Sequence, residues 1–402
     1  MENVEKKKSW PDEPVRALAQ SYAAVLCGFS AIDRYVGLPD LPVMRLETDA
    51  DLAALARTFD VPRFPGNADA AFDFQGKTWY FRCRDPDETP PAPSYRILSF
   101  SQDGRTGRFL DPCGVYPILR EFRASRNAQA KSGKDRSAKS AEAVPEPWWY
   151  GRGSRAGAYQ AVSDAALILA RYGNPSEAQR REVARTLDMR AFSYAPAEPA
   201  PNHEAQRGLL SCLLVSARPD WGLELLWERG FIDELWPELG LLNTTDQAKE
   251  FHPEGNVWHH TLATFQYRKT FDLRLSLGLL LHDLGKPRAR ASGPYRFNRH
   301  AEIGAEQARN FLERLGFDRA LIQEVCFLVR HHMIPAALTR LPLSRTQAIL
   351  DSPLFPALLE LYRCDEASSF KSFDGYYKAS AAYRAYLKHR SRAAPALPTP
   401  KP

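Results

Sequence analysis

The stretch FDLRLSLGLLLHDL, residues 271–284, is the feature that most limits how this chain can fold. Its side chains are apolar on nearly every face until the last turn, which predicts a helix buried in a core rather than one at a surface. His282 and Asp283 stand at its C-terminal end, and Gly285 and Pro287 end the helix. A carboxylate beside an imidazole in such surroundings needs a partner, and a metal ion is the simplest one.

Histidines crowd around this segment, since seven of the nine in the chain fall between His252 and His332. His259 and His260 are neighbours on a predicted helix over 257–267 and point about 100° apart, so only one of them can easily face a shared pocket. The other candidates also stand on or at the ends of predicted helices: His300 before 301–315, His331 and His332 at the end of 320–332, and Asp365 after 358–364. Several helices could therefore aim these residues at one point.

Imidazole and carboxylate ligands together suit a divalent cation such as Mn²⁺, Mg²⁺, Fe²⁺, Ni²⁺ or Co²⁺, with one or two ions per site. Such an ion polarises a phosphoryl oxygen and lowers the pKa of water, and a pair about 3.5–4 Å apart holds both attacking and leaving oxygens. Phosphoester hydrolysis is the expected chemistry. Lys286 could neutralise a substrate phosphate or, equally, interact with the C-terminal dipole of the central helix.

Five segments in order resemble the HD domain superfamily of metal-dependent phosphohydrolases: VWHHTL (257–262), LLLHDLGKP (279–287), RHAEIGAE (299–306), LVRHHM (328–333) and RCDEAS (363–368). The resemblance implies metal ligands at His260, His282, Asp283 and Asp365. Family members with two metals add positions that match His300, His331 and His332. It also implies a bridging, catalytic role for Asp283 and a phosphate contact for Lys286, whereas His259 matches no ligand.

A wider resemblance links residues 27–52, 107–119 and 209–262 to bacterial tRNA nucleotidyltransferases and poly(A) polymerases of the CCA-adding type. That family binds Mg²⁺ through two carboxylates at alternate positions of one strand, which face the same side. In this chain the matching positions hold Val43 and Arg45, so we interpret the head as degenerate. Asp49 and Asp51 also alternate, but they lie in a turn before a predicted helix over 52–58, where Asp is a common cap.

We therefore expect an α+β, nucleotidyltransferase-like head followed by mostly α-helical domains. The head should contain β-rich runs at Trp79–Arg82 and Tyr95–Phe100, and the middle domain helices at 158–172, 176–187, 204–216 and 221–229. The expected boundaries are 1–122 for the head, 123–147 for a flexible basic linker, 148–250 for a helical, RNA-binding-like middle domain, 251–390 for the HD domain and 391–402 for a disordered Pro-rich tail.

The expected linker is strongly basic, with seven Lys or Arg residues against two acidic ones between 119 and 140. Such a segment cannot bury enough apolar surface to order itself, so it is either a solvated tether or an arm that contacts RNA. The whole chain carries a net charge of +6, which permits an anionic partner without requiring one. Six scattered cysteines form no C-x-x-C pair, so neither a zinc ribbon nor a disulfide framework is indicated.

No run approaches the roughly 18 apolar residues of a membrane helix, and the start lacks the apolar stretch of a secretory signal. We expect a cytoplasmic protein without a membrane partner. The function expected first is metal-dependent hydrolysis of a nucleotide or of a terminal phosphate of RNA, tRNA included. Two alternatives stay open: a working tRNA nucleotidyltransferase, and a non-catalytic RNA-binding or regulatory protein.

Overall fold

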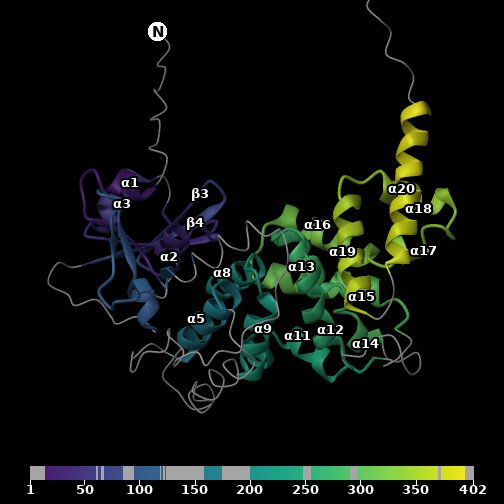
Figure 1. Cartoon of the computed structure of the whole chain (residues 1–402), viewed down its shortest axis with the longest axis horizontal. Helices are drawn as coiled ribbons and strands as arrows, with labels where there is room; N and C mark the ends of the chain where they lie inside the picture. The colour runs from purple at the N-terminus through teal and green to yellow at the C-terminus, as the bar shows by residue number, and fades with distance from the viewer. Residues whose placement is uncertain are drawn as a thin grey trace, which may run out of the picture. The chain divides into compact units, whose positions relative to one another are not determined.

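The computed structural model describes residues 14–59, 62–64, 68–84, 95–117, 119–120, 123, 158–173, 200–247, 255–289, 297–369 and 373–393 (Figure 1). They fall into two compact units, Met1–Ile168 with Tyr172–Cys212, and Leu169–Arg171 with Leu213–Pro402. The division lies inside the expected middle domain. Most of the expected linker (124–147), the helix expected over 176–187 and the end of the tail (394–402) lie outside the described residues.

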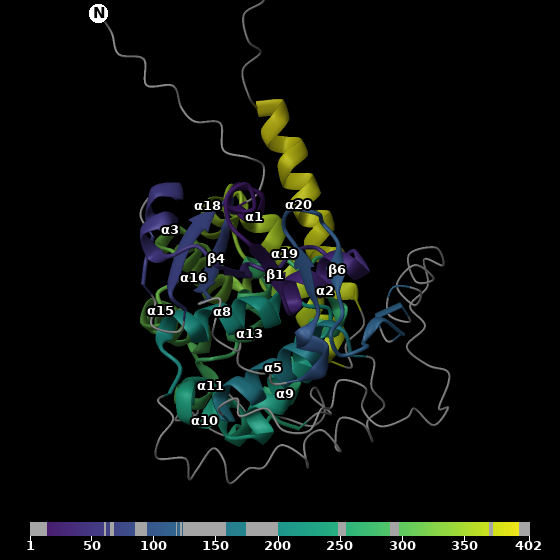
Figure 2. The same cartoon turned by 90° about the vertical axis from the view of Figure 1, so that its left-hand side faces the viewer.

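The first unit contains a six-stranded sheet in the order β3-β4-β2-β1-β5-β6. Only β2 and β4 pair in parallel, and the other neighbours are antiparallel. Helices α1 (Pro14–Leu18) and α3 (Leu52–Thr58) lie beside the sheet (Figure 2). They share one apolar cluster with it, which includes Leu26, Leu46 and Phe81. The strands are β1 (Ala24–Cys27), β2 (Val43–Thr48), β3 (Ala70–Phe74), β4 (Lys77–Cys83), β5 (Ser101–Asp103) and β6 (Phe109–Leu110). The predicted α+β head is confirmed.

The run Tyr95–Phe100 is not a strand, and that prediction was wrong. It contains a 3₁₀ helix, η1 (Arg96–Ser99), and pairing begins only with β5. Tyr95, Ile97 and Phe100 are all buried, and the Tyr95 hydroxyl donates to the carbonyl of Ala161. Residues 95 and 100 would point to opposite faces of a strand, so a tight turn is what lets all three side chains point inward.

Strand β2 shows what became of the positions where the nucleotidyltransferase resemblance requires carboxylates. Met44 and Leu46 are buried, so Val43 and Arg45 share the opposite face of the strand. Arg45 is exposed, while Val43 lies under helix α8 (His203–Leu214), where an added Cβ at Gly208 would come within 3.2 Å of its Cγ2. Neither position offers an oxygen ligand.

Asp51 caps α3, as the sequence predicted. Its side chain accepts a hydrogen bond from the backbone N–H of Ala54 at 2.6 Å. Asp49 likewise serves the backbone, because its Oδ1 accepts from the N–H of Ala23 at 2.7 Å. Both carboxylates therefore accept hydrogen bonds from the backbone of the head, and that of Asp51 does so as a helix cap.

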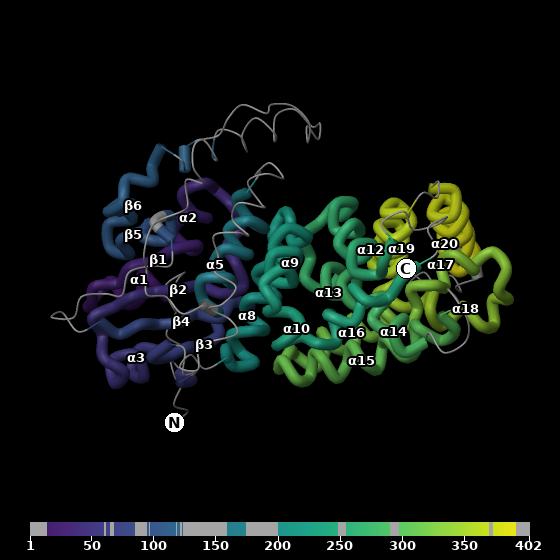
Figure 3. The backbone as a smooth tube through the Cα atoms, turned by 90° about the horizontal axis from the view of Figure 1, so that it is seen from below, coloured from purple at the N-terminus to yellow at the C-terminus, as the bar shows by residue number. Residues whose placement is uncertain are grey.

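The second unit is helical and is built around α13 (Leu273–Leu281), in which every residue from Leu275 to Leu281 is buried. It contacts α12 (Val257–Thr264), α15 (His300–Arg314), α16 (Arg319–His331) and α19 (Phe355–Ser368) (Figure 3). At Gly278 an added Cβ would lie 3.0 Å from side-chain atoms of Leu328 and Leu361. Absence of a side chain there brings α16 and α19 close to α13, and the predicted central buried helix is confirmed. Its predicted end was wrong, because α13 ends at Leu281 and Pro287 lies in the separate helix α14 (Lys286–Ala289).

The other helices of the second unit are α9 (Pro219–Glu228), α10 (Phe231–Leu235), α11 (Pro237–Gly240), α14 (Lys286–Ala289), α17 (Ile334–Ala337), α18 (Leu343–Leu350) and α20 (Asp374–Ala393), with 3₁₀ helices η2 (Leu241–Thr244) and η3 (Phe265–Tyr267). The helices predicted over 158–172, 204–216 and 221–229 are confirmed as α5 (Ala158–Arg171), α8 and α9. Among the described residues, no helix has the length and apolar character needed to cross a membrane.

Candidate metal centre

The ends of several helices bring the candidate ligands together around Asp283. Helix α13 stops at Leu281, and His282 and Asp283 lie in the turn that leads to α14. Gly285 in this turn is pressed against the first turn of α15, since an added Cβ would lie only 2.1 Å from the carbonyl oxygen of His300. This close approach of two backbones places His300, the first residue of α15, beside Asp283. Only glycine permits it.

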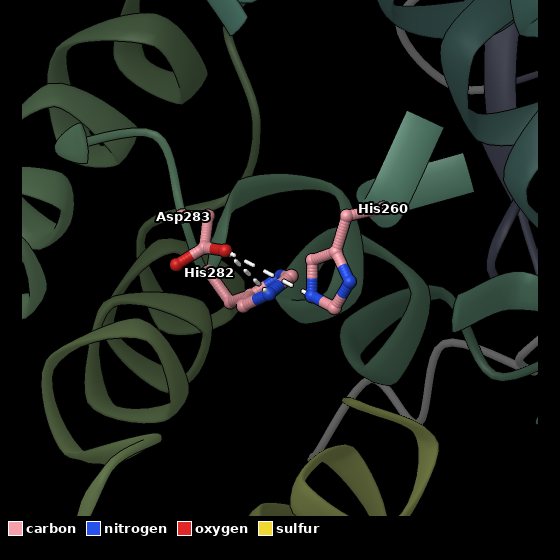
Figure 4. A group of neighbouring side chains, drawn as sticks. All are labelled: His260, His282 and Asp283. Carbon is pink, nitrogen blue, oxygen red and sulfur yellow. Dashed lines mark ion pairs between the residues drawn. The ribbon is translucent and has the colours of Figure 1, made fainter. Parts of the chain in front are cut away.

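The first ligand group consists of His260, His282 and Asp283, whose ligand atoms all lie within 4.8 Å of one another (Figure 4). All three side chains are buried. Oδ2 of Asp283 lies 3.2 Å from Nε2 of His282 and 3.9 Å from Nε2 of His260. In Figure 4 both rings direct nitrogen atoms toward this carboxylate. Oδ1 of Asp365 lies 3.0 Å from Nε2 of His260 and so borders the group.

The second ligand group consists of Asp283, His300 and His332. Here the other carboxylate oxygen of Asp283 is used: Oδ1 lies 3.6 Å from Nε2 of His300 and 3.8 Å from Nε2 of His332. The two imidazole Nε2 atoms are 3.1 Å apart. Asp283 thus belongs to both groups, with one oxygen toward each.

The backbone determines which ring nitrogen of three histidines carries hydrogen. Each Nδ1 lies at hydrogen-bond distance from the carbonyl oxygen three residues earlier. A carbonyl only accepts, so Nδ1 must donate and a neutral ring presents the lone pair of Nε2. The pairs are His282 with Leu279 at 2.8 Å, His300 with Phe297 at 2.7 Å and His332 with Val329 at 2.7 Å. Such second contacts orient histidines that bind metals.

These tautomers leave lone pairs facing one another, which suits a cation. The Nε2 atoms of His300 and His332 repel each other at 3.1 Å unless a proton or a metal ion lies between them. Nε2 of His282 is buried without a hydrogen-bond partner among the described residues, although Asp283 is only 3.2 Å away. Burial, followed by the neighbouring His282, lowers the pKa of His332 to about 3, so its ring stays neutral. The donor set fits a divalent cation in each group.

Lys286 contributes a positive charge to the same place. Its ammonium is buried, lies 2.6 Å from Oδ2 of Asp283 and donates to Oε1 of Gln247 at 2.5 Å. Burial by itself raises the pKa of the Asp283 carboxyl, but the neighbouring His282 and the Lys286 ammonium outweigh burial and hold the pKa well below its usual value. Asp283 is therefore a carboxylate, the form in which it can be a ligand.

The structure does not bring every predicted residue to the centre. His331 is the last residue of α16 and its ring lies against Phe327, with ring centroids 4.8 Å apart. It belongs to neither ligand group, whereas its neighbour His332 belongs to the second. His259 is half-exposed and lies 3.9 Å from Glu224, outside both groups, as the sequence predicted. Gln247 was missed, because no histidine or carboxylate marks its position.

Comparison with known proteins identifies the segment that carries these residues. Residues 257–366 match the HD domain family. The chain is 38% identical over 150 residues to the CC-adding tRNA nucleotidyltransferase of Thermus thermophilus, a match that covers 35% of this chain and 34% of that protein. It is 33% identical over 122 residues to the multifunctional CCA protein of Halorhodospira halophila, covering 30% and 29%. The chain thus spans about a third of the length of these curated relatives.

Solved structures give a likeness over most of the chain at low identity. A structure described as a tRNA-processing enzyme (apo form 2) is 13% identical, with a TM-score of 0.44 and coverage of 94% of this chain and 95% of that one. The Bacillus stearothermophilus CCA-adding enzyme in complex with CTP is 14% identical, with a TM-score of 0.43 and coverage of 94% and 80%. The segment 257–366, which holds all the candidate ligands around Asp283, is an HD domain.

Proposed function

We propose that the HD domain of this protein is a divalent-metal phosphohydrolase that acts on a nucleotide or on a terminal phosphate of RNA. The observation that carries the proposal is the position of Asp283, whose two oxygens face separate ligand groups. A single histidine at a helix end is commonly a neutral, capped side chain, but four histidines around one buried carboxylate are not explained by capping.

The residues would divide the work as follows. His260 and His282 would hold one cation with Oδ2 of Asp283, while His300 and His332 would hold the other with Oδ1. When bound, such cations supply Lewis acidity toward a phosphoryl oxygen and lower the pKa of water. Asp283 would connect the two groups, because it has one oxygen toward each. The backbone carbonyls that accept from Nδ1 orient the rings of His282, His300 and His332 before a metal binds, so these rings need little rearrangement on binding.

The test is hydrolysis of a substrate panel by the full chain, supplied with Mn²⁺, Ni²⁺ or Mg²⁺. The panel contains 2′,3′-cyclic nucleotides, 3′,5′-cyclic nucleotides, nucleoside monophosphates, RNA with a 3′-phosphate and p-nitrophenyl phosphate. We expect turnover that is lost with EDTA and restored by metal. A folded protein that takes up metal yet hydrolyses none of these with any of the three metals would contradict the proposal, as would a folded protein that takes up no metal.

A second candidate function is terminal nucleotide addition to tRNA, which is favoured by the names of the similar proteins from Thermus thermophilus and Halorhodospira halophila. The strand position that holds Arg45 argues against it, because a cation stands where the resemblance expects a carboxylate. Incubation with tRNA that lacks its terminal nucleotides, together with labelled CTP and ATP, decides between them. Label on the 3′ end would establish addition and show that the head binds metal by other residues.

A further inference from the structure

Gln247 is a buried residue of the centre that lies before the HD segment. It follows η2 in a short extended stretch that pairs with the residues leading into α12. Its backbone N–H donates to the carbonyl of Gly255 at 3.0 Å, and the N–H of Val257 donates to the carbonyl of Thr245 at 3.0 Å. The side chain is only 3% exposed. The backbone therefore holds Gln247 in a fixed place.

The contact with Lys286 decides which way the amide of Gln247 is turned. An ammonium only donates, so the atom 2.5 Å from it must be the amide oxygen, and the NH₂ group points elsewhere. That NH₂ group is buried and has no hydrogen-bond partner among the described residues. Given ordinary C=O and C–N bond lengths, its nitrogen lies within about 5 Å of the Lys286 nitrogen. A buried hydrogen-bond donor without an acceptor costs about 1–3 kcal/mol. A native protein therefore retains such a donor mainly where a ligand supplies the acceptor.

We propose that the NH₂ group of Gln247 adds a second donor beside Lys286, whose phosphate contact the family resemblance implies, and so completes a subsite for a phosphoryl oxygen of the substrate next to the candidate metal ligand Asp283. The inference rests on the proposed hydrolase function and adds a specificity element to it. A phosphate ester offers oxygen acceptors and no donor, which matches two neighbouring donors, one of them charged. Asp283 and Gln247 each accept one of the three ammonium hydrogens of Lys286. One hydrogen remains for the ligand.

A neutral amide is suited to this position. A carboxylate could also accept from Lys286, but it would repel a phosphate at the place where the NH₂ group attracts one. A leucine would preserve the volume while removing both polar contacts. The two substitutions therefore separate the roles: Gln247→Glu keeps the partner of Lys286 and loses the donor, and Gln247→Leu loses both.

The experiment measures binding of inorganic phosphate to the Mn²⁺-loaded full chain by isothermal titration calorimetry, with Mn²⁺ stoichiometry determined on the same samples. We expect both Gln247 variants to keep the wild-type Mn²⁺ stoichiometry. Phosphate affinity should fall at least tenfold in Gln247→Leu and further in Gln247→Glu. The matched control is Gln307→Leu: Gln307 is also buried beside the turn after α13, and with its amide oriented toward Leu284 and Arg288 both polar atoms have partners. It should bind phosphate like the wild type.

Two results would overturn the subsite. One is phosphate affinity that stays at the wild-type value in both Gln247 variants. Gln247 would then only position the Lys286 side chain and would not contact phosphate. The other is a wild-type protein that hydrolyses its substrate but does not bind phosphate. Failure of the hydrolase proposal looks different, because it leaves the wild type without turnover whether or not phosphate binding depends on Gln247.

Discussion

His300 and His332 meet nitrogen to nitrogen, with their Nε2 atoms 3.1 Å apart and each Nδ1 donating to a backbone carbonyl. Two imidazoles in this arrangement repel unless a cation separates them. The energy stored in the metal-free arrangement is released on binding, so the fold should gain stability from a divalent ion. At a concentration 100 times the dissociation constant the gain is about 2.7 kcal/mol per independent site. Thermal unfolding with and without Mn²⁺ measures it, and an unchanged Tm would contradict the assignment.

His332→Ala should weaken Mn²⁺ binding at the second ligand group by at least about tenfold, the scale seen when the shell around a metal is damaged. The paired control is His331→Ala, which removes a ring that packs on Phe327 instead of facing Asp283. We expect that variant to retain its Mn²⁺ stoichiometry. Calorimetric titration of the two variants side by side compares them. If His331→Ala alone lost an ion, the histidine assigned to the centre would be the wrong one.

Asp283→Asn keeps the size of the side chain and removes the charge that both ligand groups share. We expect loss of metal at both groups and a fall in hydrolysis of about 10³-fold or more, since residues that act as a unit fail together. Asp365 contacts His260 of the first group and belongs to neither group, so Asp365→Asn should leave the second group able to bind Mn²⁺. Counting bound Mn²⁺ by electron paramagnetic resonance distinguishes the two. Equal losses in both variants would argue against separate groups.

Gly285→Ala should displace the start of α15, because the new Cβ would lie 2.1 Å from the carbonyl oxygen of His300 and 2.6 Å from the N–H nitrogen of Gly304. Overpacking of this kind costs about 1–3 kcal/mol, and here it also moves a ligand. Gly304→Ala is a milder substitution for comparison, since a Cβ there would lie 3.1 Å from its nearest neighbour, the backbone nitrogen of Gly285. Urea unfolding and Mn²⁺ titration should both rank Gly285→Ala as the more damaging. The reverse order would refute the close-approach argument.

Cys27 provides a test in the first unit. Burial raises the pKa of its thiol to about 12, and the charges of Arg84 and Arg45 lower it by less. Because only the thiolate reacts, alkylation by iodoacetamide in the native protein should rise about tenfold per pH unit between pH 8 and 10. The same peptide in denaturant should react at half its maximal rate near pH 8.5–9 and level off above about pH 10. Mass spectrometry of labelled peptides gives both curves. A native curve that coincides with the curve in denaturant would contradict the raised pKa of the Cys27 thiol.

The sequence was most informative where one local pattern determines the outcome. The apolar run that forms α13 predicts a buried helix without any knowledge of the segments that pack on it. Asp51 caps α3 by accepting from the N–H of Ala54, only three residues away. The choice between His331 and His332 is different. Both are within one residue of the end of α16, and only the packing of that helix against α13 decides which ring meets Asp283. The sequence pattern of a single helix does not show how that helix is rotated about its axis against its neighbours.

Gln247 could not be found from the sequence for a related reason. Its role depends on a short backbone pairing with the segment before α12 and on the orientation that Lys286 imposes on its amide. The strand predicted at Tyr95–Phe100 failed for the opposite reason: its side chains favour a strand, but the run forms a tight turn whose side chains are buried against other segments, including α5. In both cases interactions between distant segments outweigh local preference.

The burial of α13 also determines how the centre can come apart. Amide hydrogens of a helix enclosed by α12, α15, α16 and α19 exchange with solvent only when the whole unit opens, so His282 and Asp283 stand at the end of what should be the slowest-exchanging segment. The ligands at the other helix ends can loosen earlier. Fluctuations would therefore release His300 or Asp365 while the His282–Asp283 pair stays in place, and a lost ion would find half of its coordination shell still assembled when it returned.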